Sequence, residues 1–313
     1  MLFTIAIPTY NNSATIAAAV ESALSQDFPQ DYEALVVNNA SDDGTLDVVS
    51  AYEGDPRLRI ISNAETCSLY ENHNVCLREA NGRYVLFCHA DDTLDSNALS
   101  VLHRRLVERG FPRRYIVWGH SFYYDYSEQL AKAGFQTGQL FAGARACGVF
   151  LEGGLTPSGT CYSKDLLEIG GFLIPQNNRA PSDASTMTLA ALRGYRFEML
   201  QEIIFFRYGG STVLAGRGRD TLLAEHGEAF RDLFSIISRH EIQMLFAQAR
   251  KRRHPPLVFY NSLSEVLPKA VARELFSYAI RHPHRVRKKA LRMTLRNAGK
   301  RFLRSSRILG SGG

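Results

Sequence analysis

Residues 83–95 read RYVLFCHADDTLD and join an apolar run to a cluster of polar side chains. The apolar part predicts a buried β-strand from Arg83 to His89. Two adjacent carboxylates, Asp91 and Asp92, follow at once. They could be solvated acids that precede the next helix, where their negative charges would interact favourably with the positive end of the helix dipole. They could instead hold a divalent cation that binds a diphosphate, because Mg²⁺ and Mn²⁺ both favour oxygen ligands.

Strand-like apolar runs alternate with helical patterns through the first 120 residues. Besides the run above, they are Leu2–Pro8, Glu33–Asn39, Leu58–Asn63 and Arg114–His120. Near-continuous apolar strands that alternate with helices predict an α/β fold with a mostly parallel central sheet flanked by helices. Asn12 or Ser13 is the expected N-cap of the first helix. Ligands of such sheets bind at the carboxyl ends of the strands, where this chain carries PTYNN, NNASDDGT and HADD.

The pattern after residue 123 is less regular. GTCYSKDLLEIGGF predicts a strand, a helix and a glycine turn. SDASTMTLAALRGY predicts a helix with Asp183 near its start, and FEMLQEIIFFR predicts one or two strands. From about Gly216 the chain has a helical pattern.

Composition and charge exclude several classes of protein. The five cysteines show no zinc-binding spacing and predict free thiols in a reducing compartment. No signal peptide or membrane-spanning run is evident, so a cytoplasmic location is expected. The net charge of +6 is concentrated in residues 281–313, which contain 11 Lys or Arg and no acid. Nucleic-acid binding is not expected, because no aromatic platform or groove-reading motif accompanies this charge.

The basic tail has an amphipathic pattern. Apolar residues recur at helical spacing at Leu291, Leu295, Ala298, Phe302 and Leu309, flanked by Lys and Arg. This pattern predicts docking on an anionic membrane surface. A solvated helix packed on the rest of the protein, or a disordered tail, is the alternative.

Phosphate-binding glycine loops are missing from the sequence. GxxxxGK[ST] does not occur, and no GxGxxG follows the first strand. A bound diphosphate would therefore be held by a metal rather than by a glycine cradle.

Six segments resemble, in their order, the family 2 glycosyltransferases, which have the GT-A fold. They span roughly residues 2–215 and are IAIPTYNNSATIAAAVESALSQ, EALVVNNASDDGT, ANGRYVLFCHADDTLDSNAL, SKDLLEIGGF, SDASTMTLAALRGY and FFRYGGST. The resemblance implies inverting transfer of a sugar from a nucleotide-diphosphate sugar, UDP- or dTDP-linked, to an acceptor hydroxyl. A glycan or lipid-linked acceptor in bacterial surface polysaccharide synthesis is the role that it suggests.

The resemblance also implies roles for single residues. Asp91 is matched to the metal ligand, with Asp92 beside it, and Mn²⁺ or Mg²⁺ as the ion. Asp183 is matched to the general base. The donor-binding positions that it implies are Pro8, Thr9, Tyr10, Asn38, His89, Ala90, Asp91 and Arg207.

Four positions depart from the family pattern. Asn38 replaces an acid that contacts the pyrimidine, but its amide can still pair with uracil or thymine. His89 replaces the first acid of the metal motif and could bind a ribose hydroxyl, or could add a nitrogen ligand that suits Mn²⁺ better than Mg²⁺. His73 stands in place of an Arg, and Ser182 in place of a Glu. These changes leave open a non-catalytic nucleotide-sugar-binding protein on the same fold.

A metal-dependent nucleotidyltransferase is a further alternative, which the lack of a glycine-rich loop after the first strand disfavours. The predicted organisation is a catalytic domain over 1–215, a helical accessory region over 216–280 and the basic tail over 281–313. The nucleotide-sugar half of the catalytic domain would cover about 1–120 and the acceptor half about 121–215. Docking of the tail would place the protein at the inner face of the plasma membrane.

Overall fold

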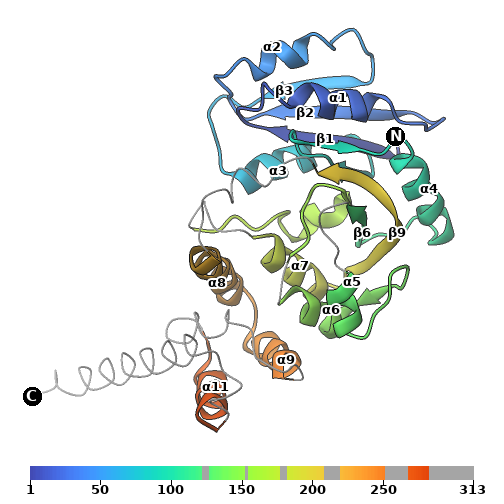
Figure 1. Cartoon of the computed structure of the whole chain (residues 1–313). Helices are drawn as coiled ribbons and strands as arrows, with labels where there is room; N and C mark the ends of the chain where they lie inside the picture. The colour runs from blue at the N-terminus through green and yellow to red at the C-terminus, as the bar shows by residue number, and fades with distance from the viewer. Residues whose placement is uncertain (122–126, 152–153, 177–181, 208–218, 251–266, 282–313) are drawn as a thin grey trace, which may run out of the picture.

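The structure is a computed structural model that describes residues 1–121, 127–151, 154–176, 182–207, 219–250 and 267–281 (Figure 1). The strands in these ranges form one sheet in the order β3-β2-β1-β4-β8-β6-β9-β5, with β7 also paired to β9. Their bounds are β1 Phe3–Thr9, β2 Tyr32–Asn38, β3 Leu58–Ser62, β4 Tyr84–Phe87, β5 Asp92–Leu94, β6 Tyr115–Ser121, β7 Phe141–Ala142, β8 Thr160–Ser163 and β9 Arg196–Arg207.

Parallel pairing joins β1, β2, β3 and β4, and separately β6 and β9. β1 is parallel to β2 and β4, β2 to β3, and β6 to β9. The short strand β8 runs antiparallel between β4 and β6, and β5 and β7 run antiparallel to β9. The predicted α/β class with a mostly parallel sheet is confirmed, with antiparallel insertions in its second half.

Helices cover both faces of the sheet. They are α1 Ile16–Leu24, α2 Thr45–Ser50, α3 Leu69–Glu79, α4 Ala98–Glu108, α5 Ser127–Lys132, α6 Gly143–Phe150, α7 Asp183–Leu192, α8 Arg219–Ile236, α9 Arg239–Arg250 and α11 Lys269–Arg281, with a 3₁₀ helix at Lys164–Ile169. Side chains of β1 alternate between two cores, because successive residues of a strand point to opposite faces. Ile5 and Ile7 pack with α1 and α4, whereas Ala6 belongs to the core that contains α3, α6 and α7.

The C-terminal helices extend the second of these cores. Phe230 of α8, Phe246 of α9 and Leu275 of α11 are buried in the same apolar cluster as α6 and α7. An ion pair between Arg193 and Glu241 ties the end of α7 to α9. A helical C-terminal extension is therefore present, and Figure 1 shows it on the side of α6 and α7 away from β1–β3.

Two local details differ from the sequence prediction. The first helix begins at Ile16, not after Asn12 or Ser13, because the Asn12 carbonyl accepts from the amides of Thr15 and Ile16 in a preceding turn. The strand β5 was not predicted, since three residues, DTL, are too few to show a strand pattern. Within the described ranges, no helix combines the length and the apolar character needed to cross a bilayer.

Candidate functional site

The carboxyl ends of β1 and β2 lie side by side. The parallel register pairs Thr9 with Asn38, and both residues are buried. The Asn38 amide nitrogen donates to the Ser62 hydroxyl at 3.3 Å, and its oxygen accepts from the Ser41 amide at 3.2 Å. Tyr10, the next residue after β1, is 49% exposed. The end of β2 thus carries a buried, hydrogen-bonded amide, and the residue after β1 carries an accessible aromatic ring.

The loops that follow β1 and β2 are joined by hydrogen bonds. The side chain of Asn11 donates to Asp42 at 2.9 Å, and the Asp42 amide donates back to Asn11 at 3.1 Å. Asp43 accepts hydrogen bonds from the Thr45 hydroxyl and from the Ser13 amide. These two hydrogen bonds hold the pKa of the Asp43 carboxyl well below the usual range. The SDDGT segment therefore stabilises the loop that carries Tyr10.

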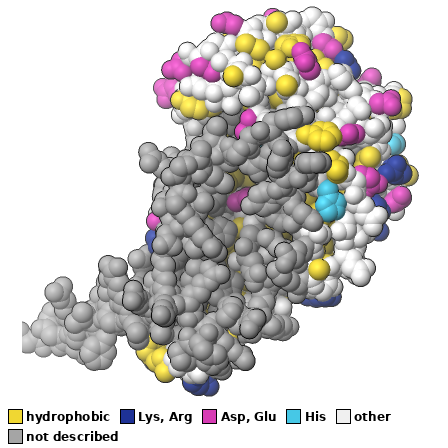
Figure 2. Space-filling view, in the orientation of Figure 1, with side chains coloured by type: hydrophobic (Ala, Val, Ile, Leu, Met, Phe, Trp, Pro, Cys, Tyr) yellow, Lys and Arg dark blue, Asp and Glu magenta, His cyan; other side chains and the backbone are white. Residues whose placement is uncertain are grey.

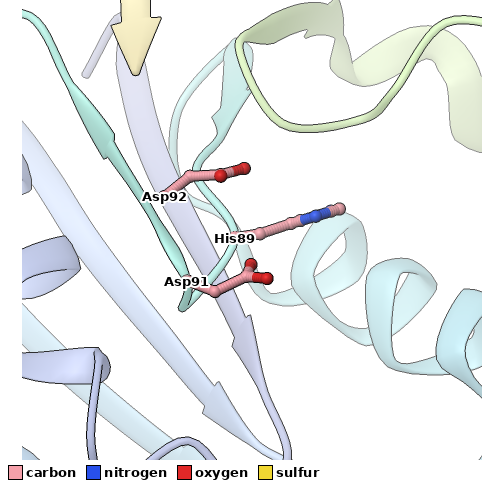
Figure 3. Close-up of side chains that lie close together, drawn as sticks. All are labelled: His89, Asp91 and Asp92. Carbon is pink, nitrogen blue, oxygen red and sulfur yellow. The ribbon is translucent and has the colours of Figure 1, made fainter. Parts of the chain in front are cut away.

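His89, Asp91 and Asp92 form a cluster with the composition of a metal site. One potential ligand atom from each residue lies within 4.8 Å of the others. Figure 3 shows the three side chains extending in the same direction, His89 and Asp91 from the turn after β4 and Asp92 from the start of β5, with the imidazole between the two carboxylates in this view. Asp92 is buried, and the other two are half-buried. Two carboxylates and one imidazole fit the oxygen- and nitrogen-ligand chemistry of a divalent ion such as Mn²⁺.

The backbone holds this cluster from two sides. The His89 amide donates to the Ser158 hydroxyl at 3.0 Å, and the Asp92 amide donates to the His89 carbonyl at 3.0 Å. The antiparallel register of β5 and β9 pairs Asp92 with Arg207. The backbone of Arg207 is thus placed beside the cluster, while its side chain lies outside the described residues.

His73 of α3 contacts His89 directly. Their Nε2 atoms are 2.9 Å apart, and Nδ1 of His73 is 2.7 Å from the Leu69 carbonyl. Burial, and then the neighbouring His89, lower the pKa of His73 to about 3, so His73 is neutral at ordinary pH. The sequence showed both histidines as departures from the family pattern, but not their contact, because His73 lies on α3 and His89 lies in the turn after β4.

Asp183 begins α7 and is partly exposed. Burial of its carboxylate raises the pKa to about 6, while the Ala184 amide, as a hydrogen-bond donor, counteracts part of this rise. A carboxylate with a pKa near neutral is a stronger base than an ordinary Asp and is still ionised at pH 7. A carboxyl group with this pKa is a candidate for accepting a proton at neutral pH.

Helix α3 contacts both Asp183 and the cluster of His89, Asp91 and Asp92. The buried Tyr70 lies near Asp183, whose negative charge adds to burial in raising the pKa of the tyrosine. Its ring centroid is 6.0 Å from that of His73, which is 5.1 Å from that of His89. Residues three apart on a helix share a face. One face of α3 thus reaches both groups, and the Tyr70 contact was not predicted from the sequence.

Several predicted features lie outside the described residues. The basic tail over 281–313 lies outside the described residues except for Arg281, and so do parts of the predicted acceptor half and accessory region. Of the predicted donor positions, Pro8 and Ala90 are buried and lie beside Thr9 and His89.

The family model described as glycosyl transferase family 2 matches residues 4–166, which is more than half of the chain. The chain belongs to the family 2 glycosyltransferases. This membership confirms the resemblance that the sequence motifs indicated. The matched region contains β1, β2, β4 and the His89–Asp92 cluster, and it ends before Asp183.

Family 2 relatives include two bacterial transferases. The chain is 36% identical over 102 residues to TarS of Staphylococcus aureus, a poly(ribitol-phosphate) β-N-acetylglucosaminyltransferase, covering 32% of this chain and 18% of TarS. It is 33% identical over 119 residues to WfaP of Escherichia coli, a UDP-Glc:α-D-GlcNAc-diphosphoundecaprenol β-1,3-glucosyltransferase, covering 37% of this chain and 47% of WfaP. The matches thus span less than half of each relative.

Solved structures extend the similarity to the whole fold. TarS residues 1–349 in complex with UDP-GlcNAc superimpose with a TM-score of 0.67 at 18% identity, covering 99% of this chain and 92% of that one. The mannosyltransferase PcManGT of Pyrobaculum calidifontis, in complex with GDP-Man and Mn²⁺, gives a TM-score of 0.55 at 18% identity, covering 96% and 86%. The GT-A fold of this family 2 chain follows from these superpositions.

Proposed function

We propose that this protein is an inverting glycosyltransferase that moves a sugar from a UDP- or dTDP-linked donor to an acceptor hydroxyl. The observation that carries the proposal is the connection of His89 and Asp183 through one face of α3. It brings a candidate metal site and a candidate base to one region at the carboxyl edge of the sheet. Family membership supplies the reaction class.

The nucleotide would bind across the ends of β1 and β2. Tyr10 offers an exposed ring on which a base can stack, with Pro8 and Thr9 behind it. The Asn38 amide is held by Ser41 and Ser62, and can donate to O4 and accept from N3–H of a uracil or thymine. O6 and N1–H of guanine offer the same acceptor and donor, so the proposed preference for a UDP- or dTDP-linked donor rests on the relatives: TarS was solved with UDP-GlcNAc, and the name of WfaP specifies UDP-Glc.

Asp91 and Asp92 would hold Mn²⁺ or Mg²⁺ against the donor diphosphate, with His89 beside them. When bound, such an ion neutralises negative charge on the departing diphosphate. Arg207, whose backbone is paired to that of Asp92, is the proposed basic contact of the donor diphosphate. Ala90, in the turn between His89 and Asp91, is a further proposed donor-binding position.

Asp183 would accept the proton of the acceptor hydroxyl while that oxygen attacks the anomeric carbon. The carbon–oxygen bond to the diphosphate breaks on the opposite face, so the configuration inverts. The relatives support this outcome, since the names of TarS and WfaP both specify a β-linked product.

A glycan or lipid-linked acceptor of bacterial surface polysaccharide is the proposed second substrate. WfaP acts on a diphosphoundecaprenol-linked sugar, and TarS on a poly(ribitol phosphate). A cytoplasmic enzyme would meet a lipid-linked acceptor at the membrane surface, where the basic tail over 281–313 would dock. Figure 2 shows acidic side chains spread over the N-terminal part of one face, around α2 and β3, so this part of the face does not suit an anionic surface.

The non-catalytic alternative is less favoured by the geometry. A decayed site would accumulate unrelated changes, yet two of the departures, His73 and His89, are hydrogen-bonded to each other. The raised pKa of Asp183 would also serve no purpose in a protein that only binds a nucleotide.

A donor screen tests the proposal. Release of nucleoside diphosphate is measured from UDP-, dTDP- and GDP-sugars with Mn²⁺, with Mg²⁺ and with chelator. We expect metal-dependent release from a UDP- or dTDP-sugar and none from GDP-sugars. Nucleotide binding without release from any donor, with acceptor glycans added, would favour the binding protein.

A further inference from the structure

Leu69, His73 and His89 form one hydrogen-bonded chain. The Leu69 carbonyl lies 2.7 Å from Nδ1 of His73, and Nε2 of His73 lies 2.9 Å from Nε2 of His89. The ring of His73 is also stacked on Phe87, with centroids 5.1 Å apart and an angle of 22° between the ring planes. The orientation of His73 is therefore fixed at three points.

The chain of contacts determines where the protons lie. A carbonyl oxygen can only accept, so the hydrogen on His73 must be on Nδ1. His73 is buried, where a charged imidazolium ring is disfavoured, so its Nε2 carries a lone pair. The short contact to His89 then requires that Nε2 of His89 donates. Nδ1 of His89 is left as the nitrogen with a lone pair when this ring is neutral.

That lone pair belongs to the residue that shares a cluster with Asp91 and Asp92. The ligand atoms of the three residues lie within 4.8 Å of one another. Figure 3 shows the ring extending from the same turn as the two carboxylates. With Nε2 occupied by His73, only Nδ1 can serve as a ligand.

We propose that His73 is a positioning residue that fixes His89 as its Nε2–H tautomer and thereby makes Nδ1 of His89 a ligand for the divalent ion. This inference rests on the metal site of the proposed function. It assigns a purpose to His73, which contacts His89 and would not itself touch the ion. It also links the two departures from the family pattern, His73 and His89, to one function.

The pair would set the ion preference of the site. A neutral imidazole suits Mn²⁺, Co²⁺ and Zn²⁺, whereas Mg²⁺ favours oxygen ligands. An outer partner that holds the ring of a ligating histidine typically changes metal affinity by about 10- to 100-fold. We therefore expect His73 to strengthen binding of Mn²⁺ much more than binding of Mg²⁺.

The tautomers can be read directly by ¹⁵N NMR of the imidazoles in the metal-free, full-length protein. The signals are assigned by their loss in His73→Gln and His89→Asn variants. We expect the proton of His73 on Nδ1 and that of His89 on Nε2. Addition of Cd²⁺ with UDP should then move the Nδ1 signal of His89. A proton on Nδ1 of His89 at neutral pH would overturn the assignment, and so would an unchanged Nδ1 signal at saturating Cd²⁺.

Two variants of His73 separate positioning from packing. His73→Gln retains an oxygen that can accept from His89, whereas His73→Met fills similar volume without a comparable acceptor. Affinities for Mn²⁺ and Mg²⁺ are measured by calorimetry in the presence of UDP. We expect His73→Met to lose about 10-fold or more in Mn²⁺ affinity and about twofold at most in Mg²⁺ affinity, with the Gln variant close to wild type. Equal losses for both ions, or no loss, would refute the positioning role.

The outcome is distinguishable from failure of the proposed function. The tautomers and the ion affinities need no sugar donor and no turnover. If no donor yields nucleoside diphosphate while Mn²⁺ binding responds to His73 as described, the site is a metal–nucleotide site without transfer. If His73→Met does not fold, the NMR result on the wild-type protein decides the inference.

Discussion

Gly154 lies against the carboxylate of Asp183. A Cβ atom at Gly154 would be 2.5 Å from Cγ and 2.6 Å from Oδ2 of Asp183, and 2.4 Å from the backbone nitrogen of Ala184. These distances are far inside van der Waals contact, and one of the atoms is backbone. The candidate base is therefore held in place by a residue that has no side chain.

Gly154→Ala should displace the carboxylate and lower turnover. A shift of about 1 Å in a reacting group can cost on the order of 100-fold in rate. We expect a loss of about 10- to 100-fold in kcat with nearly unchanged UDP affinity, measured by product release and calorimetry. Gly54→Ala is the matched control, because a Cβ there meets nothing within 4 Å. Similar kcat values for the two variants would show that the position of Asp183 is not critical.

Asp183→Asn should remove turnover and leave donor binding intact, because the base contacts the acceptor. General-base catalysis contributes a factor of about 10² to 10⁴. In the wild type, kcat/KM should fall about tenfold per pH unit below pH 6, following the pKa of Asp183, and level off above it. A variant that retains turnover, or a flat pH profile between 5 and 7, would assign the base to another group.

The same substitution should stabilise the fold at neutral pH. Folding raises the pKa of Asp183 from 3.8 to about 6, so its contribution to stability is greatest at low pH and is lost as the pH rises through 6. The full shift corresponds to about 3 kcal/mol, and partial exposure reduces the expected gain to about 1–2 kcal/mol. We expect Asp183→Asn to raise Tm by about 2–4 °C at pH 7.5.

Repeating the Tm measurement at low pH is the control for this effect. At pH 4 to 5 the wild-type carboxyl is largely protonated in the folded state, so the difference in Tm between variant and wild type should shrink. A difference in Tm that is equal at both pH values would mean that burial of the charge is not its cause.

Asp91→Asn should weaken binding of the ion, because it replaces a carboxylate by a neutral amide of the same shape. We expect Mn²⁺ affinity in the presence of UDP to fall at least about tenfold, with donor turnover lost at limiting metal. Asp31→Asn is the control, since Asp31 is exposed and precedes β2 at the opposite end of the strand. Full activity in chelator would contradict the metal site itself.

The sequence was sufficient for the strand ends but not for the contacts between distant elements. Apolar runs that end in PTYNN, NNASDDGT and HADD located the carboxyl edge correctly, because buried parallel strands have a continuous apolar pattern. The pairing of Asp92 with Arg207 depends on β5, which has no pattern of its own. The contacts of α3 with His89 and Asp183 depend on how the helix is rotated against the sheet, which helical periodicity alone does not give.

The basic tail should bind anionic membranes in a salt-dependent manner. Each Lys or Arg near anionic lipid contributes about 1 kcal/mol, and residues 281–313 contain 11 of them with no acid. The full-length chain is compared with a chain that ends at Arg281, which keeps α11 complete. We expect co-sedimentation of only the full-length chain with anionic vesicles, decreasing as salt is raised, and none with neutral vesicles. A second variant with Arg292, Arg296, Lys300 and Arg301 changed to Gln keeps the apolar residues and should bind weakly. Binding by the truncated chain, or full binding by the Gln variant, would assign membrane contact to another surface or to the apolar residues alone.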